Sequence, residues 1–168
     1  MEVFEIIKKR RSIRKYKDEK IDKKILEKIL EAGRLAPSTR NSQNWKFIMV
    51  TEKELLQKVA SSMTQDFGRE AQAIIVACGI KDSEYMKSNQ PKTAIDISVA
   101  TAYMQLVALE ENIGSCWIGS FDAEIVREAI GIPSNMCAVT LTTLGYMDEN
   151  PDARPRKEFD EVCKFNEY

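Results

Sequence analysis

Apolar side chains recur at helical spacing in five stretches of the chain, which predicts helices over residues 2–9, 22–35, 52–63, 93–112 and 122–130. Polar residues stand where four of these helices should begin. Asp22, Thr93 and Asp122 occupy N-cap positions, and Thr51 with Glu54 forms a capping-box pattern. The pattern therefore predicts well-defined helix starts.

The fourth stretch differs from the others because its apolar residues cover more than one helical face. We expect such a helix to be buried on two sides, and a subunit contact is one way to achieve that burial. Gly114 follows the stretch and should end the helix in the left-handed conformation.

Four shorter stretches predict strands over residues 45–50, 73–78, 116–121 and 139–146. Residues 73–78 form an unbroken apolar run, which is typical of a strand buried at the centre of a sheet. Strands and helices do not alternate regularly along the chain. We therefore predict an α+β fold with a central mixed, mainly antiparallel sheet flanked by helices.

Two segments stand outside this pattern. Residues 81–92 are polar and read as a flexible or lid-like excursion. From Met147 onward the chain is rich in Asp, Glu, Pro, Arg and Lys, with too few apolar residues to fold alone. We predict one domain over residues 1–168, with residues 146–168 as a C-terminal extension that packs on other structure.

Composition narrows the class of protein. The 168 residues are 43% hydrophobic and 30% charged, which is typical of a globular domain, and the net charge of −1 offers no general attraction to nucleic acid or membrane. We see neither a signal peptide nor a membrane span, and expect a cytoplasmic protein. The four cysteines are far apart, so we expect free, buried thiols and no metal site.

The chain contains no histidine. That absence excludes Ser-His-Asp and Cys-His nucleophilic sites and most zinc chemistry, because these depend on imidazole. The glycines form neither a dinucleotide-binding fingerprint nor a Walker A loop. An enzyme with this composition needs chemistry supplied by a cofactor or by carboxylates.

Two polar stretches carry the candidate chemistry. Pro37 stops the second helix, and the loop up to Trp45 is rich in hydrogen-bonding side chains. It is either a plain connection or a ligand-binding loop. The basic run from Lys8 to Lys17 is either a solvated charged segment or a contact surface. A nucleic-acid role is disfavoured, because acidic residues flank the run and no aromatic platform accompanies it.

Together these stretches resemble the nitroreductase family of FMN-dependent oxidoreductases. The resemblance rests on residues in the family's order: Arg10, Ser12, Arg14, Pro37, Ser38, Thr39, Asn41, Ser42, Gln43, Trp45 and the segment Cys116-Trp117-Ile118-Gly119. It departs from the family at Thr39, where Ser is usual, and at Asn44, where Pro is usual. Losing that proline puts the backbone path of the loop in question.

The resemblance implies FMN as cofactor. Its phosphate would be held by Arg10, Arg11, Ser12, Arg154, Arg156 and Lys157. Its ring would lie against Arg14, Gln65, Trp117, Ile118 and Gly119. The polar loop would reach the flavin of a partner subunit through Pro37, Ser38, Thr39 and Asn41. A cation at Arg14 would stabilise the negative charge of the reduced flavin. No side chain is expected to act as catalytic acid, base or nucleophile.

Simpler readings of the same residues remain open. Arg14 can form a surface salt bridge with Asp18 or Glu19, and Trp117 can belong to the core. The cations of the tail can be ordinary surface charge.

The activity that the resemblance implies is ping-pong hydride transfer from NADH or NADPH, through FMN, to a nitroaromatic, a quinone or a similar small-molecule acceptor. It also implies a homodimer with FMN at the interface, whose C-terminal tails cross over and extend the partner's sheet. Alternatives are a flavin storage or sensor protein, a flavin-modifying or dehalogenating relative, and a basic binding module. The sequence selects neither the acceptor nor one of the two nucleotides.

Overall fold

The computed structural model describes residues 2–81 and 85–168 of the chain. In chain order the elements are α1 (Val3–Lys9), α2 (Lys23–Arg34), the 3-10 turn η1 (Thr39–Asn41), β1 (Trp45–Val50), α3 (Lys53–Ala60), the 3-10 turn η2 (Asp66–Glu70), β2 (Ala73–Ile80), α4 (Lys92–Glu110), β3 (Ile113–Ile118), α5 (Ala123–Ile130), β4 (Met136–Tyr146) and α6 (Phe159–Val162).

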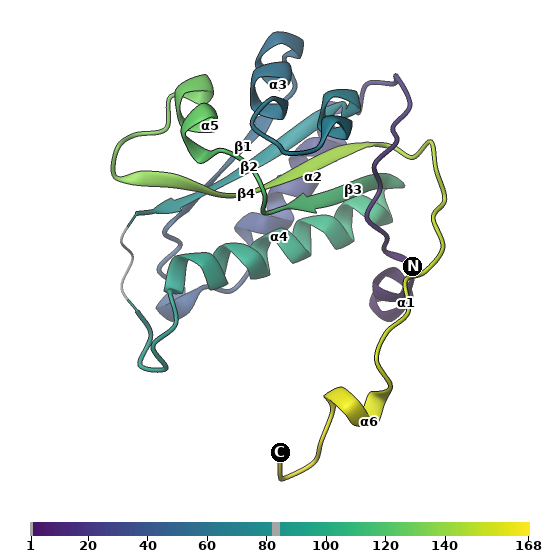
Figure 1. The fold of residues 1–168 in the computed structure, drawn as a ribbon, viewed down its shortest axis with the longest axis vertical. Coiled ribbons are helices and arrows are strands. Elements are labelled where there is room, and N and C mark those ends of the chain that lie inside the picture. The colour runs from purple at the N-terminus through teal and green to yellow at the C-terminus, as the bar shows by residue number, and fades with distance from the viewer. Residues whose placement is uncertain (1, 82–84) are drawn as a thin grey trace.

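The strands form one antiparallel sheet in the order β1-β2-β4-β3. A parallel backbone contact lies beside it, at the isolated bridge between Ser12 and Ser115. Helices α2 and α4 cover one face of the sheet, and α3 and α5 cover the other (Figure 1). The predicted α+β fold is confirmed.

Strand β2 joins the two layers of core. Ile74 packs with Val59 and Val126 on the α3–α5 side, whereas Ile75 packs with Met104 on the α2–α4 side. All five side chains are at most 1% exposed. Burying an aliphatic side chain of this size contributes about 1.5–3 kcal/mol. The unbroken apolar run therefore is the central strand that it predicted.

Two of the predicted N-caps are confirmed. The Asp22 carboxylate accepts the backbone N–H of Lys24 at 2.7 Å, and the Asp122 carboxylate accepts that of Glu124 at 2.9 Å. Each bond satisfies a donor that the first helical turn leaves without an intrahelical partner.

The other two predicted caps are wrong. Helix α3 is capped by Glu52 and not by Thr51, because the Glu52 carboxylate accepts the N–H groups of residues 54 and 55 at 3.0 and 2.7 Å. A carboxylate offers two acceptor atoms and a negative charge suited to a helix N-terminus. Helix α4 begins at Lys92 directly after Pro91, so Thr93 lies inside its first turn.

The predicted end of α4 is also wrong. Asn112, with φ 59°, takes the left-handed conformation, and Gly114 lies within β3. A Cβ on Gly114 would come 2.6 Å from Met147 Cγ and 2.9 Å from Ile13 Cγ2, so this glycine serves close packing instead. Strand β3 consequently begins at Ile113, earlier than the predicted residues 116–121, and β4 begins at Met136.

The polar segment 81–92 includes residues 82–84, which lie outside the described residues. In the remainder of that segment, Tyr85 forms an isolated bridge with Pro91, and Lys92 already belongs to α4. The described residues contain no helix with the length and apolarity that crossing a membrane requires.

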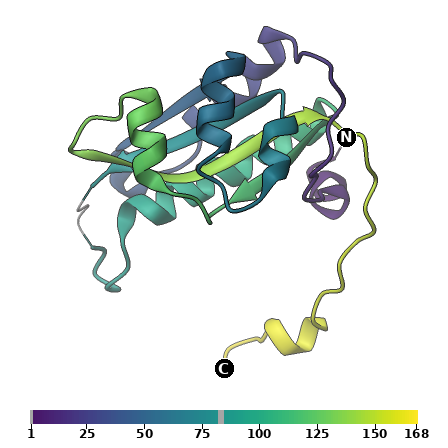
Figure 2. The ribbon, with the colours of Figure 1, turned by 45° about the horizontal axis from the view of Figure 1, so that its top comes forward.

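Beyond β4 the chain leaves the body of the molecule (Figures 1 and 2). Met147 still bridges to Tyr16, but the tail then runs outward and carries only the short helix α6. Its side chains Phe159 and Phe165 are 62% and 81% exposed. The predicted packing of residues 146–168 on a partner subunit stays a prediction.

Candidate functional site

The site begins with residues 12–17, which follow α1 and lie along the ends of β3 and β4. The Ile13 N–H donates to the Ser115 carbonyl at 3.0 Å, and the Lys17 N–H donates to the Tyr146 carbonyl at 2.9 Å. These bonds fix both ends of the segment against the sheet. Ile13 and Tyr16 point inward and are buried, whereas Arg14 stays partly exposed.

Tyr16 ties this segment to β4. Its hydroxyl donates to the Ile13 carbonyl at 2.5 Å and lies 2.7 Å from the Thr143 hydroxyl. Its ring occupies the space above Gly145, where a Cβ would meet Tyr16 atoms at 2.6–2.9 Å. Burial raises the pKa of Tyr16, so the hydroxyl stays protonated and keeps its role as donor.

Arg14 is held through its backbone, whereas its guanidinium donates one long hydrogen bond, of 3.4 Å, to the Ser12 carbonyl. The Glu149 carboxylate accepts the backbone N–H groups of Arg14 and Lys15. The guanidinium lies 5.8 Å from the centroid of the Phe67 ring, within the range of a cation–π contact. In the described residues it forms no salt bridge with Asp18 or Glu19, so that simpler reading is wrong.

A cavity of about 180 Å³ lies beside this guanidinium. Five of the predicted ring-contacting residues line it together: Arg14, Gln65, Trp117, Ile118 and Gly119. The indole of Trp117 is 48% exposed, so the alternative that Trp117 belongs to the core is wrong. The sequence motifs thus converge on one place although they come from three separate parts of the chain.

Four further residues line the same cavity and were not predicted: Met63, Thr64, Cys116 and Ser120. The Thr64 hydroxyl lies 3.4 Å from that of Ser120, which joins the turn before η2 to the end of β3. Burial raises the pKa of Cys116, so this thiol is protonated at neutral pH. Its place in the Cys-Trp-Ile-Gly segment was the only signal in the sequence.

A second cavity, of about 250 Å³, lies at the other end of residues 10–14. Lys9, Arg10 and Arg11 line it together with Gly114, Ser115, Met147 and other residues. Ser12 bridges to Ser115, which also lines this cavity. The Arg11 guanidinium donates to the carbonyls of Lys8 and Arg10 at 2.8 and 3.0 Å, so it already stabilises the end of α1.

The cations of the tail are not brought to these cavities. Arg154, Arg156 and Lys157 are exposed and line none of the three cavities described here. Arg156 donates only along the tail, to the carbonyls of Arg154 and Pro155 at 3.4 and 3.5 Å. Their predicted place at a phosphate is therefore not formed within one copy of the chain.

The polar loop also lies elsewhere. The backbone N–H and hydroxyl of Thr39 donate to Asp96 near the start of α4, whereas Leu109 near its end lines the second cavity. Thirteen residues of α-helix separate these two positions, a distance of about 20 Å. One copy therefore holds Pro37, Ser38, Thr39 and Asn41 apart from Arg10.

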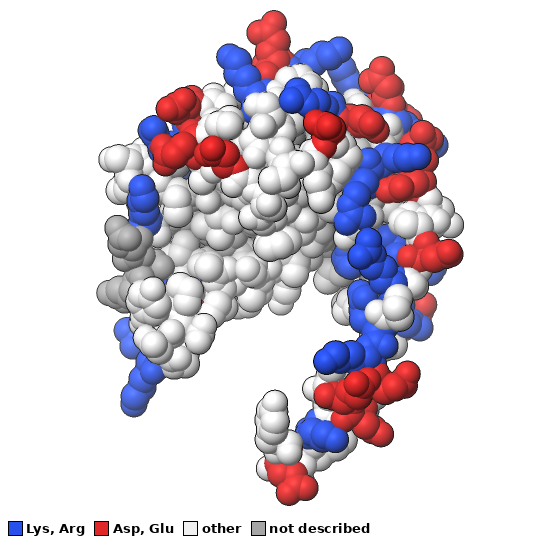
Figure 3. Space-filling view, in the orientation of Figure 1, with Lys and Arg blue, Asp and Glu red and all other residues white. Residues whose placement is uncertain are grey.

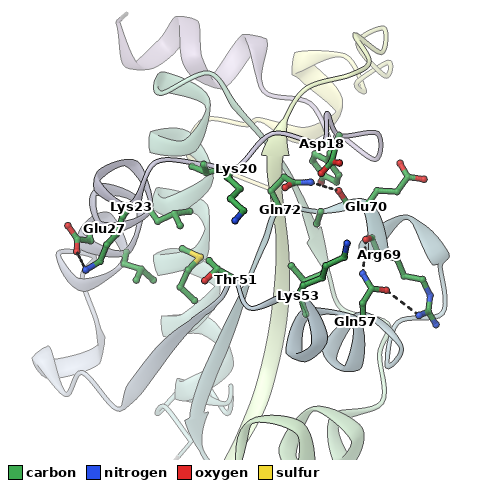
Figure 4. Close-up of a pocket in the computed structure, with 17 residues that line it drawn as sticks. Asp18, Lys20, Lys23, Glu27, Thr51, Lys53, Gln57, Arg69, Glu70 and Gln72 are labelled. Atoms are coloured by element: carbon green, nitrogen blue, oxygen red, sulfur yellow. Dashed lines mark hydrogen bonds and ion pairs between the residues drawn. The ribbon is translucent and has the colours of Figure 1, made fainter.

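The largest of the three cavities described here, of about 1040 Å³, lies between α2, the end of β1, α3 and η2 (Figure 4). None of the predicted flavin residues lines it. Lys20 and Lys53 extend into it from opposite sides, but its four cations face three carboxylates, and Lys23 pairs with Glu27 at 3.4 Å. The two smaller cavities combine four cations with no carboxylate. Charge therefore favours the smaller pair as the site for a dianionic phosphate.

Comparison with known proteins agrees with this geometry. The sequence matches the Nitroreductase family over residues 7–67 and 59–146. A relative from Archaeoglobus fulgidus, with the provisional name NADH dehydrogenase/NAD(P)H nitroreductase, is 38% identical over 158 residues, which cover 90% of this chain and 88% of that protein. An oxygen-insensitive NADPH nitroreductase from Helicobacter pylori strain J99 is 29% identical, covering 69% of this chain and 74% of that protein.

Solved structures with a similar fold also carry nitroreductase names. A nitroreductase family protein from Clostridium difficile 630 has a TM-score of 0.90, with 30% identity and full coverage of both chains. An FMN-dependent nitroreductase from Clostridium difficile R20291 has a TM-score of 0.84 and 33% identity, with 97% of this chain and 98% of that chain covered. The chain belongs to the nitroreductase family, and the family that its motifs resemble is confirmed.

Proposed function

We propose that this protein is an FMN-dependent oxidoreductase that uses NADH or NADPH to reduce nitroaromatics, quinones or similar electron-poor acceptors. The observation that carries the proposal is the pair of cavities along residues 9–14, which together are lined by four cations and no carboxylate. Membership of the nitroreductase family supports it, as does the name of the FMN-dependent relative from Clostridium difficile R20291.

The residues present fit a flavin nucleotide. Arg10 and Ser12 offer a guanidinium and a hydroxyl to the phosphate, and charge-assisted hydrogen bonds of this kind contribute about 1.5–3 kcal/mol each. Arg14 places a fixed positive charge beside the cavity that Trp117 and Gly119 line. When bound, FMN would supply hydride transfer between the nicotinamide nucleotide and the acceptor.

The side chains around the two cavities bind and orient, and they do not exchange protons. No imidazole or carboxylate lines either cavity, and the Cys116 thiol is protonated because burial raises its pKa. Arg14 stabilises the negative charge that a flavin gains on reduction. We infer that the proton for the acceptor comes from solvent, because both cavities open to the surface.

Each copy contributes half of the proposed site. Cavities of 180 and 250 Å³ are smaller than the 300–1,000 Å³ typical of a cofactor pocket, and the polar loop lies about 20 Å away along α4. A second copy would bring its own Pro37, Ser38, Thr39 and Asn41 to the flavin and enclose it. The site thus requires a homodimer.

The surface supports this assembly. Basic side chains, with acidic ones among them, gather along the arm formed by the N-terminal segment and the tail, whereas the hollow between that arm and α4 carries almost no charge (Figure 3). Exposed apolar side chains occur on α1, on α4 and on the tail: Val3, Phe4, Ile7, Ile95, Tyr103, Phe159, Val162 and Phe165. We propose that the second copy covers these residues, that the tails exchange, and that Arg154, Arg156 and Lys157 then reach the phosphate.

The test is a visible spectrum of the purified protein, followed by anaerobic titration with NADH and with NADPH and then by addition of menadione or a nitroarene. The proposal expects a yellow protein that is bleached by one of the nucleotides and recoloured by the acceptor. Bound flavin without turnover would favour a storage or sensor role. A colourless protein that retains nucleic acid in a salt-sensitive way would favour a basic binding module.

The dimer is tested by sedimentation of the flavin-loaded protein. We expect a single species of twice the chain mass. A stable monomer that carries flavin would contradict the shared site. Reactivity of the Cys163 thiol gives a second measurement, because Cys163 is exposed in one copy but would be covered once its tail packs on the partner subunit.

A further inference from the structure

Asp96 is a buried carboxylate whose one hydrogen-bond partner among the described residues is Thr39. It lies in α4, is 7% exposed, and belongs to none of the salt bridges in the described part of the chain. One of its oxygens, Oδ1, accepts the Thr39 backbone N–H at 3.0 Å and the Thr39 hydroxyl at 2.9 Å. A buried charge requires such donors, so this contact constrains the loop strongly.

The loop that Asp96 holds has an unfavourable backbone. Arg40, Asn41 and Gln43 all take left-handed conformations, with φ of 54°, 54° and 50°, although none of them is glycine. Such residues persist only where surrounding contacts fix them. Ser38 closes the turn internally, because its carbonyl accepts the Asn41 N–H at 2.9 Å and its hydroxyl accepts the Gln43 N–H at 3.1 Å.

These contacts divide the loop into an anchor and a presented surface. Thr39 turns toward α4 and uses its hydroxyl on Asp96, so this hydroxyl is not free for a ligand. Asn41 stays exposed and Ser38 partly exposed on either side of it. The role expected of Thr39 as a flavin ligand is therefore better described as a structural role.

We propose that Asp96 is a positioning residue, which fixes Thr39 so that Ser38 and Asn41 are presented to the flavin bound by a second copy. The inference rests on the proposed function for its ligand and on the Asp96–Thr39 contact for its geometry. It assigns Ser38 and Asn41 as flavin ligands and Thr39 as the loop residue that Asp96 of α4 holds in place.

The first experiment measures amide hydrogen exchange of residues 39–43 in flavin-free protein. We expect Asp96→Ala to speed exchange about tenfold and Asp96→Asn to change it by less than about threefold, because the amide oxygen of Asn still accepts both bonds. The control is Thr101→Val on the same helix. The Thr101 hydroxyl donates only to the Ile97 carbonyl, at 2.7 Å, so exchange in the loop should stay unchanged.

The second experiment measures FMN affinity by quenching of flavin fluorescence. We expect Asp96→Ala to weaken binding about tenfold, with recovery in Asp96→Asn. Thr39→Val should weaken it by less than about tenfold, because its backbone N–H remains. The Asp96→Ala/Thr39→Val double variant should bind no more weakly than Asp96→Ala alone, since the two residues act through one contact.

The outcomes separate the two proposals. Wild-type protein that binds no FMN would overturn the proposed function and the flavin role of Asp96 with it. Wild-type protein that binds FMN, with unchanged affinity and loop exchange in Asp96→Ala, would overturn the positioning role alone. Thr39→Val keeps the test valid if Asp96→Ala fails to fold, because Thr39 lies in a surface loop.

Discussion

Glu149 accepts the backbone N–H of Arg14, although 135 residues separate them in the sequence. Glu149 stands where β4 leads into the tail, so this bond joins the cationic segment to the start of the tail. The same carboxylate accepts the Lys15 N–H at 3.2 Å. It thus ties the segment that follows Arg10 and Ser12 to the start of the tail without occupying the Arg14 guanidinium.

Removing this carboxylate should weaken flavin binding. Glu149→Ala leaves two backbone donors without their partner, and a hydrogen bond to a charged acceptor is worth about 1.5–3 kcal/mol, so we expect a loss of about tenfold or more in FMN affinity. Glu149→Gln keeps an acceptor oxygen and should lose less. Equal affinity for wild type and Glu149→Ala, measured by fluorescence titration, would contradict this role.

The phosphate assignment is tested by removing cations from both ends of the chain. Arg10→Ala with Arg156→Ala should give largely flavin-free protein with the fold intact, because two charge-assisted contacts of about 1.5–3 kcal/mol each are lost. The matched control is Lys20→Ala with Lys53→Ala, which removes the same charge from the largest cavity. Flavin content from the absorption spectrum should fall only in the arginine variant. The opposite result would move the cofactor to the cavity of Figure 4.

The loop should reject the proline that is usual in the family. Gln43 has φ 50°, and a following proline disfavours the helical regions for the residue that precedes it. We expect Asn44→Pro to lower the free energy of unfolding by about 1–3 kcal/mol in urea denaturation. Asn44→Ala should stay within about 0.5 kcal/mol of wild type. A stabilised Asn44→Pro variant would mean that the loop takes the extended path instead.

A buried thiol makes stability depend on alkaline pH. Burial, with a smaller contribution from Cys137, raises the pKa of Cys78 from 9.0 to about 11. Between these two pH values the unfolded chain loses the thiol proton, whereas the folded chain keeps it. The contribution of Cys78 to the free energy of unfolding is therefore fully present below pH 9 and is lost as pH rises toward 11.

Cys78→Ala should flatten that fall, measured by urea denaturation under reducing conditions from pH 8 to 10. Part of the slope should remain, since burial also raises the pKa of Cys116. A profile identical in wild type and Cys78→Ala would refute the linkage.

Local patterns in the sequence predicted local structure well. The apolar run of β2 and the caps at Asp22 and Asp122 depend on neighbouring residues, and all three are confirmed. The cap at Glu52 was missed because two adjacent residues could both cap, and only the side-chain geometry chose between them. Asn112 took the left-handed position expected of Gly114 because packing against Met147 needed the glycine in β3.

The candidate site shows the same contrast between features that short motifs predict and features that distant contacts decide. Family motifs predicted the grouping of Arg14 with Gln65, Trp117 and Gly119, which the structure brings to one cavity. The Asp96–Thr39 contact joins residues 57 positions apart and follows no local pattern, so it could not be predicted from the sequence. The tail cations could not be placed from the sequence either, because the order of motifs along the chain does not show which copy of the chain the tail packs on.

The chain has only two tryptophans, and each adjoins one half of the proposed site. Trp117 lines the cavity beside Arg14, and Trp45 directly follows the polar loop at the start of β1. Tryptophan fluorescence overlaps the absorption of a flavin, so excitation energy would transfer to FMN bound nearby and quench the tryptophan emission. FMN occupancy can therefore be followed by this quenching in untagged protein. The variants Trp45→Phe and Trp117→Phe would show which tryptophan, and so which half of the site, reports the binding.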